Sequence, residues 1–362
     1  MEKKIKNLLK LMDENSIEAY MIGPSTDLRF LIGLSTFVCE RFQAFFLLNN
    51  GDFFYISPQV YYEEVKNILD KSKVFMWKDR EGFVGILKDT INRYNLKDKR
   101  IAINNTISAV NLIDIENICN CKFINGQKLL ENLRIIKSEK EVKKLKKAAK
   151  LADEIMRKTI NYIKPGITEN DIKEKIKTII TKLETEGVSF EPIVSSGPNS
   201  SKPHYNKGER TIQKKDIIIL DLGCVYKGYC SDMSRTVFVG DISIKEKKVY
   251  NIVKKAYQSA EDIVKEGITA EDVDQKARSI IEKAGYGDYF INRTGHGIGV
   301  SVHEAPFIKT GNKIKLKKGM AFSIEPGIYI PGEFGIRIED IVIVTEDGKK
   351  ILNKYPNEII II

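Results

Sequence analysis

Two aspartates in the second half of the chain stand where their carboxylates need a partner. Asp221 lies in the apolar segment Ile217–Gly223, and Asp232 follows across a short polar stretch. A carboxylate buried in an apolar strand costs several kcal/mol or takes up a proton unless something compensates its charge. Asp221 should therefore be buried and needs a partner that compensates its charge.

Asp221 and Asp232 are expected on the same face of a β-hairpin. Tyr226, Lys227 and Gly228 predict a turn, with a two-residue loop at either 226–227 or 227–228. Opposing residues of an antiparallel pair have positions with a constant sum, and both loops make that sum odd, which aligns the two acids. Adjacent carboxylates repel unless one is protonated or cations bridge them. The alternative is a solvent-facing acid pair with Arg235 as its partner, and the hairpin alone does not decide between the two.

A second pair of acids has the same setting and favours the first interpretation. Glu325 interrupts the apolar segment Ala321–Gly327, and Glu339 stands among isoleucines in Ile336–Val344, beyond a loop at 331–335. These positions are also compatible with one shared face across a hairpin. Four acids on inward strand faces would need two divalent cations between them, and hard cations with carboxylate ligands are the expected occupants.

The three histidines of the chain are His204, His296 and His303, and each lies in a stretch rich in Gly or Pro. His296 is flanked by Gly295 and Gly297, which permit a close approach of the backbone. A lone histidine is usually structural or exposed. The shared context of all three favours a functional role.

Two parts of the chain must position these residues. Residues 1–128 are predicted to form an α/β domain, because helical and strand patterns alternate in it. Ile5, Leu8, Leu9 and Met12 form a helical stripe. Short apolar runs that predict strands lie at 19–22, 45–48, 53–56, 74–76 and 101–103.

Residues 129–362 are predicted to form a second, α+β domain with a weak internal repeat. A capping box from Ser138 to Glu141 opens a long helix. The segment Lys164–Ile172 then resembles Lys265–Val273, and in both a Gly turn precedes a helix capped by Thr and Asp. Acidic residues follow on strands in both halves, so we expect a site between the halves.

Composition excludes several other classes of protein. The 362-residue chain has a formal charge of +10, but its lysines alternate with acids along helix faces, so we predict no nucleic-acid site. No apolar run approaches the roughly 18 residues of a membrane span. The N-terminus leads into an amphipathic helix rather than a signal peptide, and five cysteines without paired spacing fit a reducing cytoplasm.

The acidic and histidine segments, taken together and in order, resemble the pita-bread metallopeptidases, which include methionine aminopeptidase, aminopeptidase P and prolidase. The match runs from roughly Leu133 to the end of the chain. The first part, with Leu28–Gly33, is similar to the extra domain of the proline-directed branch, which methionine aminopeptidases lack. The motifs that carry the resemblance are Asp221–Gly223, Ser231–Thr236, Gly295–Gly299, Val302–Pro306, Ile324–Gly327 and Arg337–Asp340.

The resemblance implies a centre of two divalent metal ions, typically Mn2+ or Co2+. By this resemblance, Asp221 would hold one metal, His296 and Glu325 would hold the other, and Asp232 and Glu339 would bridge both. It further implies a proline-containing dipeptide or short peptide as substrate and a homodimer as the assembly.

Four residues would have catalytic roles by the same resemblance. His204 and His303 would hydrogen-bond the intermediate and the proline side of the substrate. Glu325 would carry a proton to the leaving proline nitrogen, and Arg337 would orient the site or a substrate carboxylate. The implied activity is hydrolysis of the Xaa-Pro bond.

One departure from the family pattern leaves the substrate length open. Many dipeptide-specific prolidases have an arginine directly after Val-His-Glu-x-Pro, where it helps to hold the carboxylate of the dipeptide. Here that position is Phe307, with Lys309 nearby. Dipeptidase and aminopeptidase are therefore both candidate activities of this protein. Two further alternatives are a non-enzymatic binding or scaffold member of the family and a creatinase-like hydrolase that acts without metal.

Overall fold

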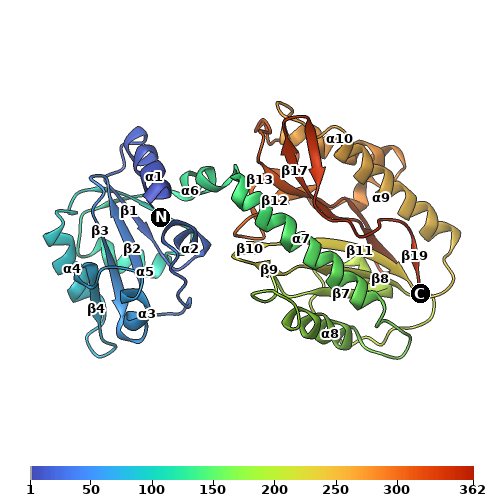
Figure 1. Cartoon of the computed structure of the whole chain (residues 1–362), viewed down its shortest axis with the longest axis horizontal. Coiled ribbons are helices and arrows are strands. Elements are labelled where there is room, and N and C mark those ends of the chain that lie inside the picture. Colours follow the sequence, from blue (N-terminus) through green and yellow to red (C-terminus); the bar gives the residue numbers. More distant parts are fainter. Residues whose placement is uncertain (1) are drawn as a thin grey trace. The chain divides into compact units, whose positions relative to one another are not determined.

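The computed structural model describes residues 2–362, which form two compact units (Figure 1). The first unit ends at Arg134, and the second comprises Ile135–Ile362. This division falls slightly after the predicted one at residues 128 and 129. The reason is helix α6 (Gln127–Arg134), which packs against α1 (Glu2–Glu14) and so extends the first unit.

The first unit is built on one mixed sheet of six strands in the order β4-β3-β2-β1-β5-β6. The central strands β1, β2 and β3 pair antiparallel, whereas β4, β5 and β6 join parallel to their neighbours. All five predicted strands are confirmed. The bounds are Ala19–Ile22 (β1), Ala44–Leu48 (β2), Phe53–Pro58 (β3), Val74–Trp77 (β4), Arg100–Ile103 (β5) and Lys122–Asn125 (β6).

Helices cover both faces of this sheet and enclose two apolar cores. One core is closed by α1, α2 (Thr26–Ile32), α3 (Tyr62–Lys66) and α6, and Leu8 and Met12 of the predicted stripe are fully buried in it. The other core is closed by α4 (Val84–Arg93) and α5 (Ala109–Glu116). Short 3-10 helices lie at Gln59–Tyr61 and Lys71–Lys73.

The second unit contains two helix pairs, each with its own core. The first pair is α7 (Glu139–Ile160) and α8 (Glu169–Thr181), and the second is α9 (Ile244–Asp262) and α10 (Ala270–Lys283). The predicted capping boxes of α7, α8 and α10 are confirmed, and α9 begins with a further box at Ser243. Each box satisfies backbone N–H groups that the first turn of a helix leaves without partners.

Each helix pair packs on its own sheet (Figure 1). The first sheet has the order β19-β11-β8-β7, and the second has the order β13-β12-β14-β17-β18. Two short hairpins, β9-β10 and β15-β16, complete the unit. The strand bounds are Ile193–Ser196 (β7), Ile217–Leu222 (β8), Val225–Tyr226 (β9), Tyr229–Cys230 (β10), Met233–Phe238 (β11), Gly295–Gly297 (β12), Glu304–Ile308 (β13), Ala321–Ile324 (β14), Gly327–Ile330 (β15), Phe334–Arg337 (β16), Asp340–Thr345 (β17), Gly348–Ile351 (β18) and Ile360–Ile361 (β19). Two 3-10 helices lie at Gly197–Ser201 and Gly287–Tyr289.

The register of the β8–β11 hairpin follows the second of the two predicted loops. Tyr226 pairs with Tyr229, which leaves Lys227 and Gly228 as the turn, with φ values of 45° and 78°. Positive φ at both central positions is the geometry of a type I′ turn, whose twist matches that of a hairpin. The same register continues to Asp221, which lies opposite Ser234. Asp221 and Asp232 are therefore on one face, as predicted.

The two sheets of the second unit meet where β11 lies against the segment between β16 and β17. Arg235 is fully buried at this junction. Its guanidinium donates to Asp340 Oδ1 at 2.7 Å and to the carbonyls of Ser234, Glu339, Tyr355 and Pro356 at 2.6–2.9 Å. The alternative in which Arg235 neutralises a solvent-facing acid pair is therefore wrong, because Arg235 is a structural link between the halves.

Replacing Arg235 by Met is expected to lower the free energy of unfolding of the second unit by about 3–5 kcal/mol, because Asp340 would stay buried without its cation. Urea unfolding measures the loss. The matched control is Lys245→Met, which removes a half-exposed pair with Glu333 and should cost at most about 1 kcal/mol. A loss below about 1 kcal/mol for Arg235→Met would contradict the structural role of this residue.

Candidate metal centre

The eight residues predicted to form the site line one cavity of about 170 Å³ in the second unit. Asp221 and Asp232 come from the first half of the repeat, and the remaining acids from the second half. The other residues of the predicted set in this lining are His204, His296, His303, Glu325, Arg337 and Glu339. The structure thus brings the set together, while the role of each residue stays a prediction.

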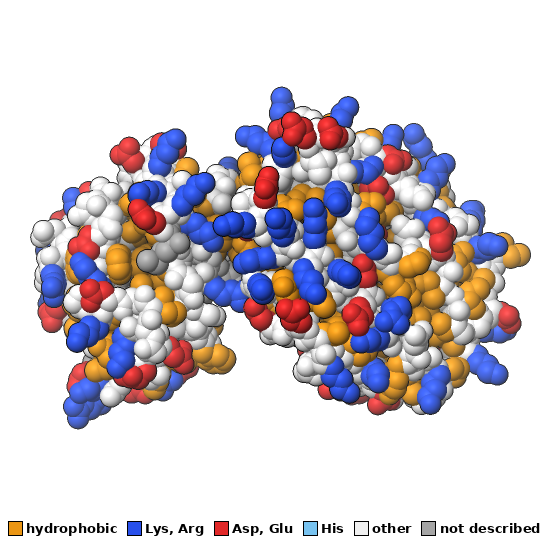
Figure 2. Space-filling view, in the orientation of Figure 1, with side chains coloured by type: hydrophobic (Ala, Val, Ile, Leu, Met, Phe, Trp, Pro, Cys, Tyr) orange, Lys and Arg blue, Asp and Glu red, His pale blue; other side chains and the backbone are white. Residues whose placement is uncertain are grey.

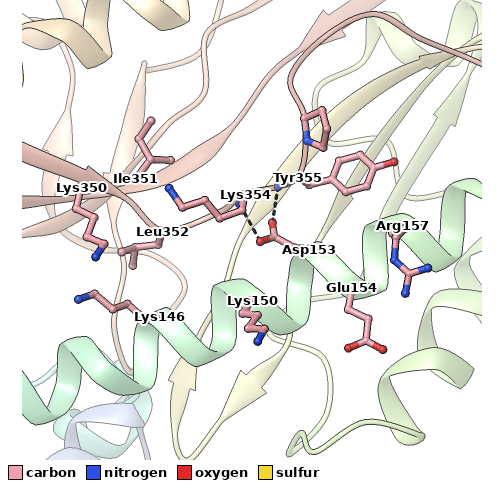
Figure 3. A pocket seen from close by; sticks show the side chains of 11 residues that line it. Lys146, Lys150, Asp153, Glu154, Arg157, Lys350, Ile351, Leu352, Lys354 and Tyr355 are labelled. Atoms are coloured by element: carbon pink, nitrogen blue, oxygen red, sulfur yellow. Dashed lines mark hydrogen bonds between the residues drawn. The ribbon is translucent and has the colours of Figure 1, made fainter.

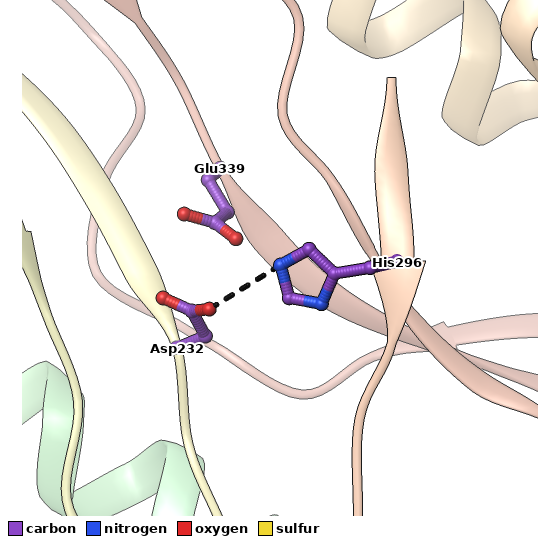
Figure 4. A group of neighbouring side chains, drawn as sticks. All are labelled: Asp232, His296 and Glu339. Carbon is purple, nitrogen blue, oxygen red and sulfur yellow. Dashed lines mark ion pairs between the residues drawn. The ribbon is translucent and has the colours of Figure 1, made fainter. Parts of the chain in front are cut away.

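Asp232, His296 and Glu339 form a compact group in the cavity (Figure 4). Each of these buried side chains offers one ligand atom, and the three atoms lie within 4.8 Å of one another. His296 Nε2 is 3.6 Å from Asp232 Oδ2. Three donors from three separate segments that converge on one point are the arrangement that a metal ion requires.

Asp221 and Glu325 flank this group and have partners of their own. Asp221 Oδ2 accepts a hydrogen bond from Arg337 Nη2 at 2.7 Å. Glu325 Oε1 lies 3.2 Å from His296 Nε2 and accepts a hydrogen bond from Ser323 Oγ at 3.0 Å. The five predicted ligands therefore form a continuous cluster around His296 and Arg337.

Glu325 and Glu339 face each other because of the strand register. Ile324 pairs with Asp340 in the β14–β17 ladder, and Gly327 pairs with Arg337 in the β15–β16 ladder. Paired residues have the same sum of positions in both ladders, so the two ladders continue one register. In the gap between the ladders, this register places Glu325 opposite Glu339. The shared face expected from the sequence is therefore present.

Burial sets the electrostatics of the cluster. Asp221, Asp232 and Glu339 are only 9%, 4% and 1% exposed, which excludes a solvent-facing acid pair. Burial raises the pKa of Asp221, and burial together with neighbouring carboxylates raises the pKa values of Asp232 and Glu339 well above their usual range. For Glu325 burial also opposes ionisation, but the contact with His296 outweighs it and lowers the pKa to about 2.

The donor set fits divalent cations. One oxygen each of Asp221, Asp232 and Glu339 is buried without a hydrogen-bond partner within the described part of the chain. Buried oxygens are normally paired, and unpaired ones need an explanation such as an ion. Four carboxylates face one guanidinium and one imidazole, so the protein itself does not balance their charge. An oxygen-rich set with one imidazole suits hard or borderline cations such as Mn2+.

Hydroxyl side chains that the sequence prediction missed orient the cluster. Ser234 Oγ donates to Glu339 Oε2 at 2.8 Å and accepts from Arg337 Nε at 2.8 Å. Ser323 Oγ accepts from the backbone N–H of His296 at 3.0 Å. Because side chains alternate along a strand, Asp232 shares its face with Ser234, and Glu325 shares its face with Ser323. That alternation was the signal available in the sequence.

Glycines let the strand of His296 approach its neighbours. A Cβ atom at Gly295 would lie 1.8 Å from the Ser323 carbonyl oxygen, and one at Gly297 would lie 2.2 Å from the Ala305 carbonyl oxygen. Any other residue at these positions would push β12 away from β13 and β14. The close approach expected from the sequence is confirmed.

Buried charges at equivalent positions of the repeat hold the histidine loops. Lys173 follows Ile172 in the first half, and its ammonium donates to the carbonyls of Asn206 and Lys207 in the loop that carries His204. Asp274, at the matching position in the second half, accepts from Thr294 Oγ1 at 2.7 Å. It also accepts from Thr310 Oγ1 at 2.7 Å. The two residues thereby anchor the segments around His204, His296 and His303.

His303 and His204 lie at the open side of the cavity. The rings of His303 and His296 pack edge to face, with centroids 4.2 Å apart. Burial and the neighbouring His296 and Arg293 side chains lower the pKa of His303 to about 4. His204 is exposed on the loop after the 3-10 helix Gly197–Ser201. Both imidazoles can therefore reach a ligand that enters the cavity.

A larger cavity of about 820 Å³ lies elsewhere in the second unit, between α7 and the chain after β18 (Figure 3). Asp153 accepts hydrogen bonds from the backbone N–H groups of Lys354 and Tyr355 there. Lysines and Arg157 make up most of its polar lining, without converging acids or histidines. It lacks the donor set of a metal centre.

The surface around α7 carries many Lys and Arg side chains interspersed with acidic ones (Figure 2). This mixture agrees with solvated helix faces, and the absence of a nucleic-acid partner stays a prediction. All five cysteines are unpaired. No helix within residues 2–362 has both the length and the apolar character needed to cross a membrane.

Comparison with known proteins agrees with this architecture. Residues 143–346 match metallopeptidase family M24, and residues 4–136 match the creatinase/prolidase N-terminal domain. An Xaa-Pro dipeptidase from Lactobacillus helveticus is 38% identical, with 97% of this chain and 96% of that protein covered. The crystal structure of a prolidase from Thermococcus sibiricus has a TM-score of 0.96 and 37% identity, with 100% and 99% covered. An X-Pro aminopeptidase from Thermotoga maritima has a TM-score of 0.86 and 31% identity, with 99% of each chain covered.

The matches confirm the fold predicted from the sequence, an N-terminal α/β domain of the creatinase type followed by a pita-bread catalytic domain with an internal repeat. Both family models apply, and together they span most of the chain. The protein is thus a metallopeptidase of family M24 that carries the creatinase/prolidase N-terminal domain.

Proposed function

We propose that this protein hydrolyses the Xaa-Pro bond of dipeptides or short peptides with the help of two divalent metal ions. The observation that carries the proposal is the convergence of three buried carboxylates, the partly buried Glu325 and His296 in one cavity. Three of the carboxylate oxygens have no hydrogen-bond partner within residues 2–362. The Xaa-Pro dipeptidase and prolidase relatives, similar over nearly the whole chain, support the choice of substrate.

Asp221, Asp232, His296, Glu325 and Glu339 would hold the metals, with Mn2+ or Co2+ as the preferred ions. Two such ions, when bound, lower the pKa of a water molecule and polarise the scissile carbonyl. The protein fixes the ligand geometry through Ser234, Ser323 and the buried strands that carry the acids.

The remaining chemistry falls to side chains at the open side of the cavity. Glu325 lies beside His296 and faces the open side of the cavity, where its carboxylate would accept a proton from the attacking water and pass it to the leaving nitrogen. Proline leaves as a secondary amine and must be protonated. His303 and His204 would hydrogen-bond the reacting carbonyl and the proline side, while Arg337 keeps Asp221 in place.

The homodimer and the cytoplasmic location expected from the sequence stay part of this proposal. Light scattering after size-exclusion chromatography measures the mass of the assembly and so tests the homodimer. The T. maritima relative, an X-Pro aminopeptidase, keeps longer peptides among the candidate substrates.

Metal binding is expected to stabilise the protein strongly. At a hundredfold excess over its dissociation constant, Mn2+ should raise the melting temperature of the chelator-treated protein by about 5–10 °C. In Asp232→Asn one of the mutually repelling carboxylates becomes neutral, so its metal-free form should melt above the metal-free wild type and should gain less from Mn2+. Calorimetry measures both quantities. A full Mn2+ shift in the variant would contradict the assignment of Asp232 as a ligand.

Loss of a bridging ligand is expected to abolish turnover. Asp232→Ala and Glu339→Ala, each loaded with Mn2+, should lose at least about 10³-fold in kcat on Ala-Pro, because either change opens the metal pair. His204→Ala should reduce kcat while its melting temperature stays near that of the wild type, since His204 is exposed. Unchanged turnover in His204→Ala would show that its loop has no part in catalysis.

Activity on Ala-Pro or Ala-Pro-Pro with Mn2+ tests the proposed function itself. We expect cleavage of at least one of the two peptides and no cleavage of the matched Ala-Ala, since the proline ring is the recognised feature. Metal binding without cleavage of any Xaa-Pro peptide would instead indicate a non-enzymatic binding protein, and activity retained after complete metal removal would indicate creatinase-like chemistry.

A further inference from the structure

A dipeptide Xaa-Pro brings a free carboxylate next to the bond that is cut, and this anion needs a cation at the mouth of the cavity. The inference below rests on the proposed function. Arg337 does not supply this cation, because it is buried and its guanidinium already donates to Asp221, Ser234 and Tyr329 at 2.7–2.9 Å.

Arg293 is the cation that faces the open side of the site. It lines a wider cavity of about 670 Å³ together with His204, His296, His303 and Glu325. Its side chain is half-buried, and no hydrogen bond or ion pair joins it to another residue in the described range 2–362. Its guanidinium therefore has its full hydrogen-bonding capacity available for a ligand.

The ring of Phe307 fixes the orientation of this guanidinium. Arg293 Cζ lies 4.8 Å from the centroid of the Phe307 ring. An arginine over an aromatic face keeps its planar edge of N–H donors free, and that edge matches a carboxylate with two parallel hydrogen bonds. Phe307 occupies the position where dipeptide-specific relatives are expected to have an arginine. In this chain, the positive charge next to that position comes from Arg293, which lies in another segment.

The backbone around Arg293 is anchored on both sides. Arg278 donates to the carbonyls of Phe290 and Asn292 at 3.0 Å, and Asp274 holds Thr294. Such support is what a binding residue needs to hold its geometry. Lys309, the other cation close to Phe307 in the sequence, is exposed and does not line either cavity of the site.

We propose that Arg293 binds the C-terminal carboxylate of the substrate and so determines the preference for dipeptides. In a dipeptide the carboxylate belongs to the proline itself, whereas in a longer peptide it lies at least one residue further away. Arg293 acts on substrate binding and takes no part in the proton transfers.

The test compares Ala-Pro with Ala-Pro amide, which differ only in the charge at the C-terminus. The Mn2+-loaded wild type should prefer the free acid by about 10- to 100-fold in kcat/KM, mainly through KM, as expected for a charge-assisted hydrogen-bonded pair. Arg293→Met and Arg293→Gln should reduce this preference to about twofold or less, with little change in activity on the amide. Arg293→Lys should retain part of the preference for the free acid. The matched control, Lys309→Met, should retain the full preference.

Two results would overturn the inference. The first is a preference for the acid that persists in both neutral variants, and the second is an equal loss on acid and amide, which would indicate a structural role. Melting temperatures of the variants show that both comparisons concern folded protein. If the wild type cleaves neither of these substrates nor Ala-Pro-Pro, the proposed function itself is wrong. If the wild type is active but the Arg293 variants keep its preference for the acid, only the role of Arg293 is wrong.

Discussion

Repulsion between four carboxylates in one buried cavity is the constraint on which this structure depends. Asp221 lies on β8, whereas Asp232, Glu325 and Glu339 lie between consecutive strands and line the same cavity. Arg337 and His296 are their nearby positive or polar partners. Without further compensation such a cluster opposes folding, because buried like charges disfavour ionisation. In the proposed function, divalent cations would turn the same cluster into a binding site, and the chemistry of a peptidase would follow from the metals it holds.

The internal repeat explains how one chain builds this cluster. Each half contributes a helix pair, a sheet and a buried charge, Lys173 or Asp274, that anchors a histidine-bearing segment. The halves meet along β11, where Arg235 links both sheets. Acids from the first half thereby face acids and His296 from the second. The predicted ligands come from both halves, and neither half contains the full set.

Much of this arrangement could be predicted from local patterns. The Lys227–Gly228 turn dictates the hairpin register, and the register dictates that Asp221 and Asp232 share a face. Glycines at 295 and 297 predicted close packing of the strand that carries His296. These inferences succeeded because they depend on residues near one another in the sequence, where steric rules are strict.

Contacts between distant segments could not be predicted in the same way. The sequence offers Arg235 as a partner of the hairpin acids, but in the structure it pairs with Asp340, more than a hundred residues away. Arg293 had no signal in the sequence, since its position over Phe307 arises only from the fold. Local patterns therefore predicted the residues of the proposed metal centre, whereas the proposed role of Arg293 could be inferred only from the tertiary structure.

Anomalous diffraction from crystals grown with Mn2+ tests the central claim most directly. The account predicts two anomalous peaks per chain, both in contact with Asp232 and Glu339, one also with Asp221 and the other with His296 and Glu325. An absence of peaks at saturating Mn2+, or a single peak outside this cluster, would contradict the claim that paired cations compensate the buried carboxylates.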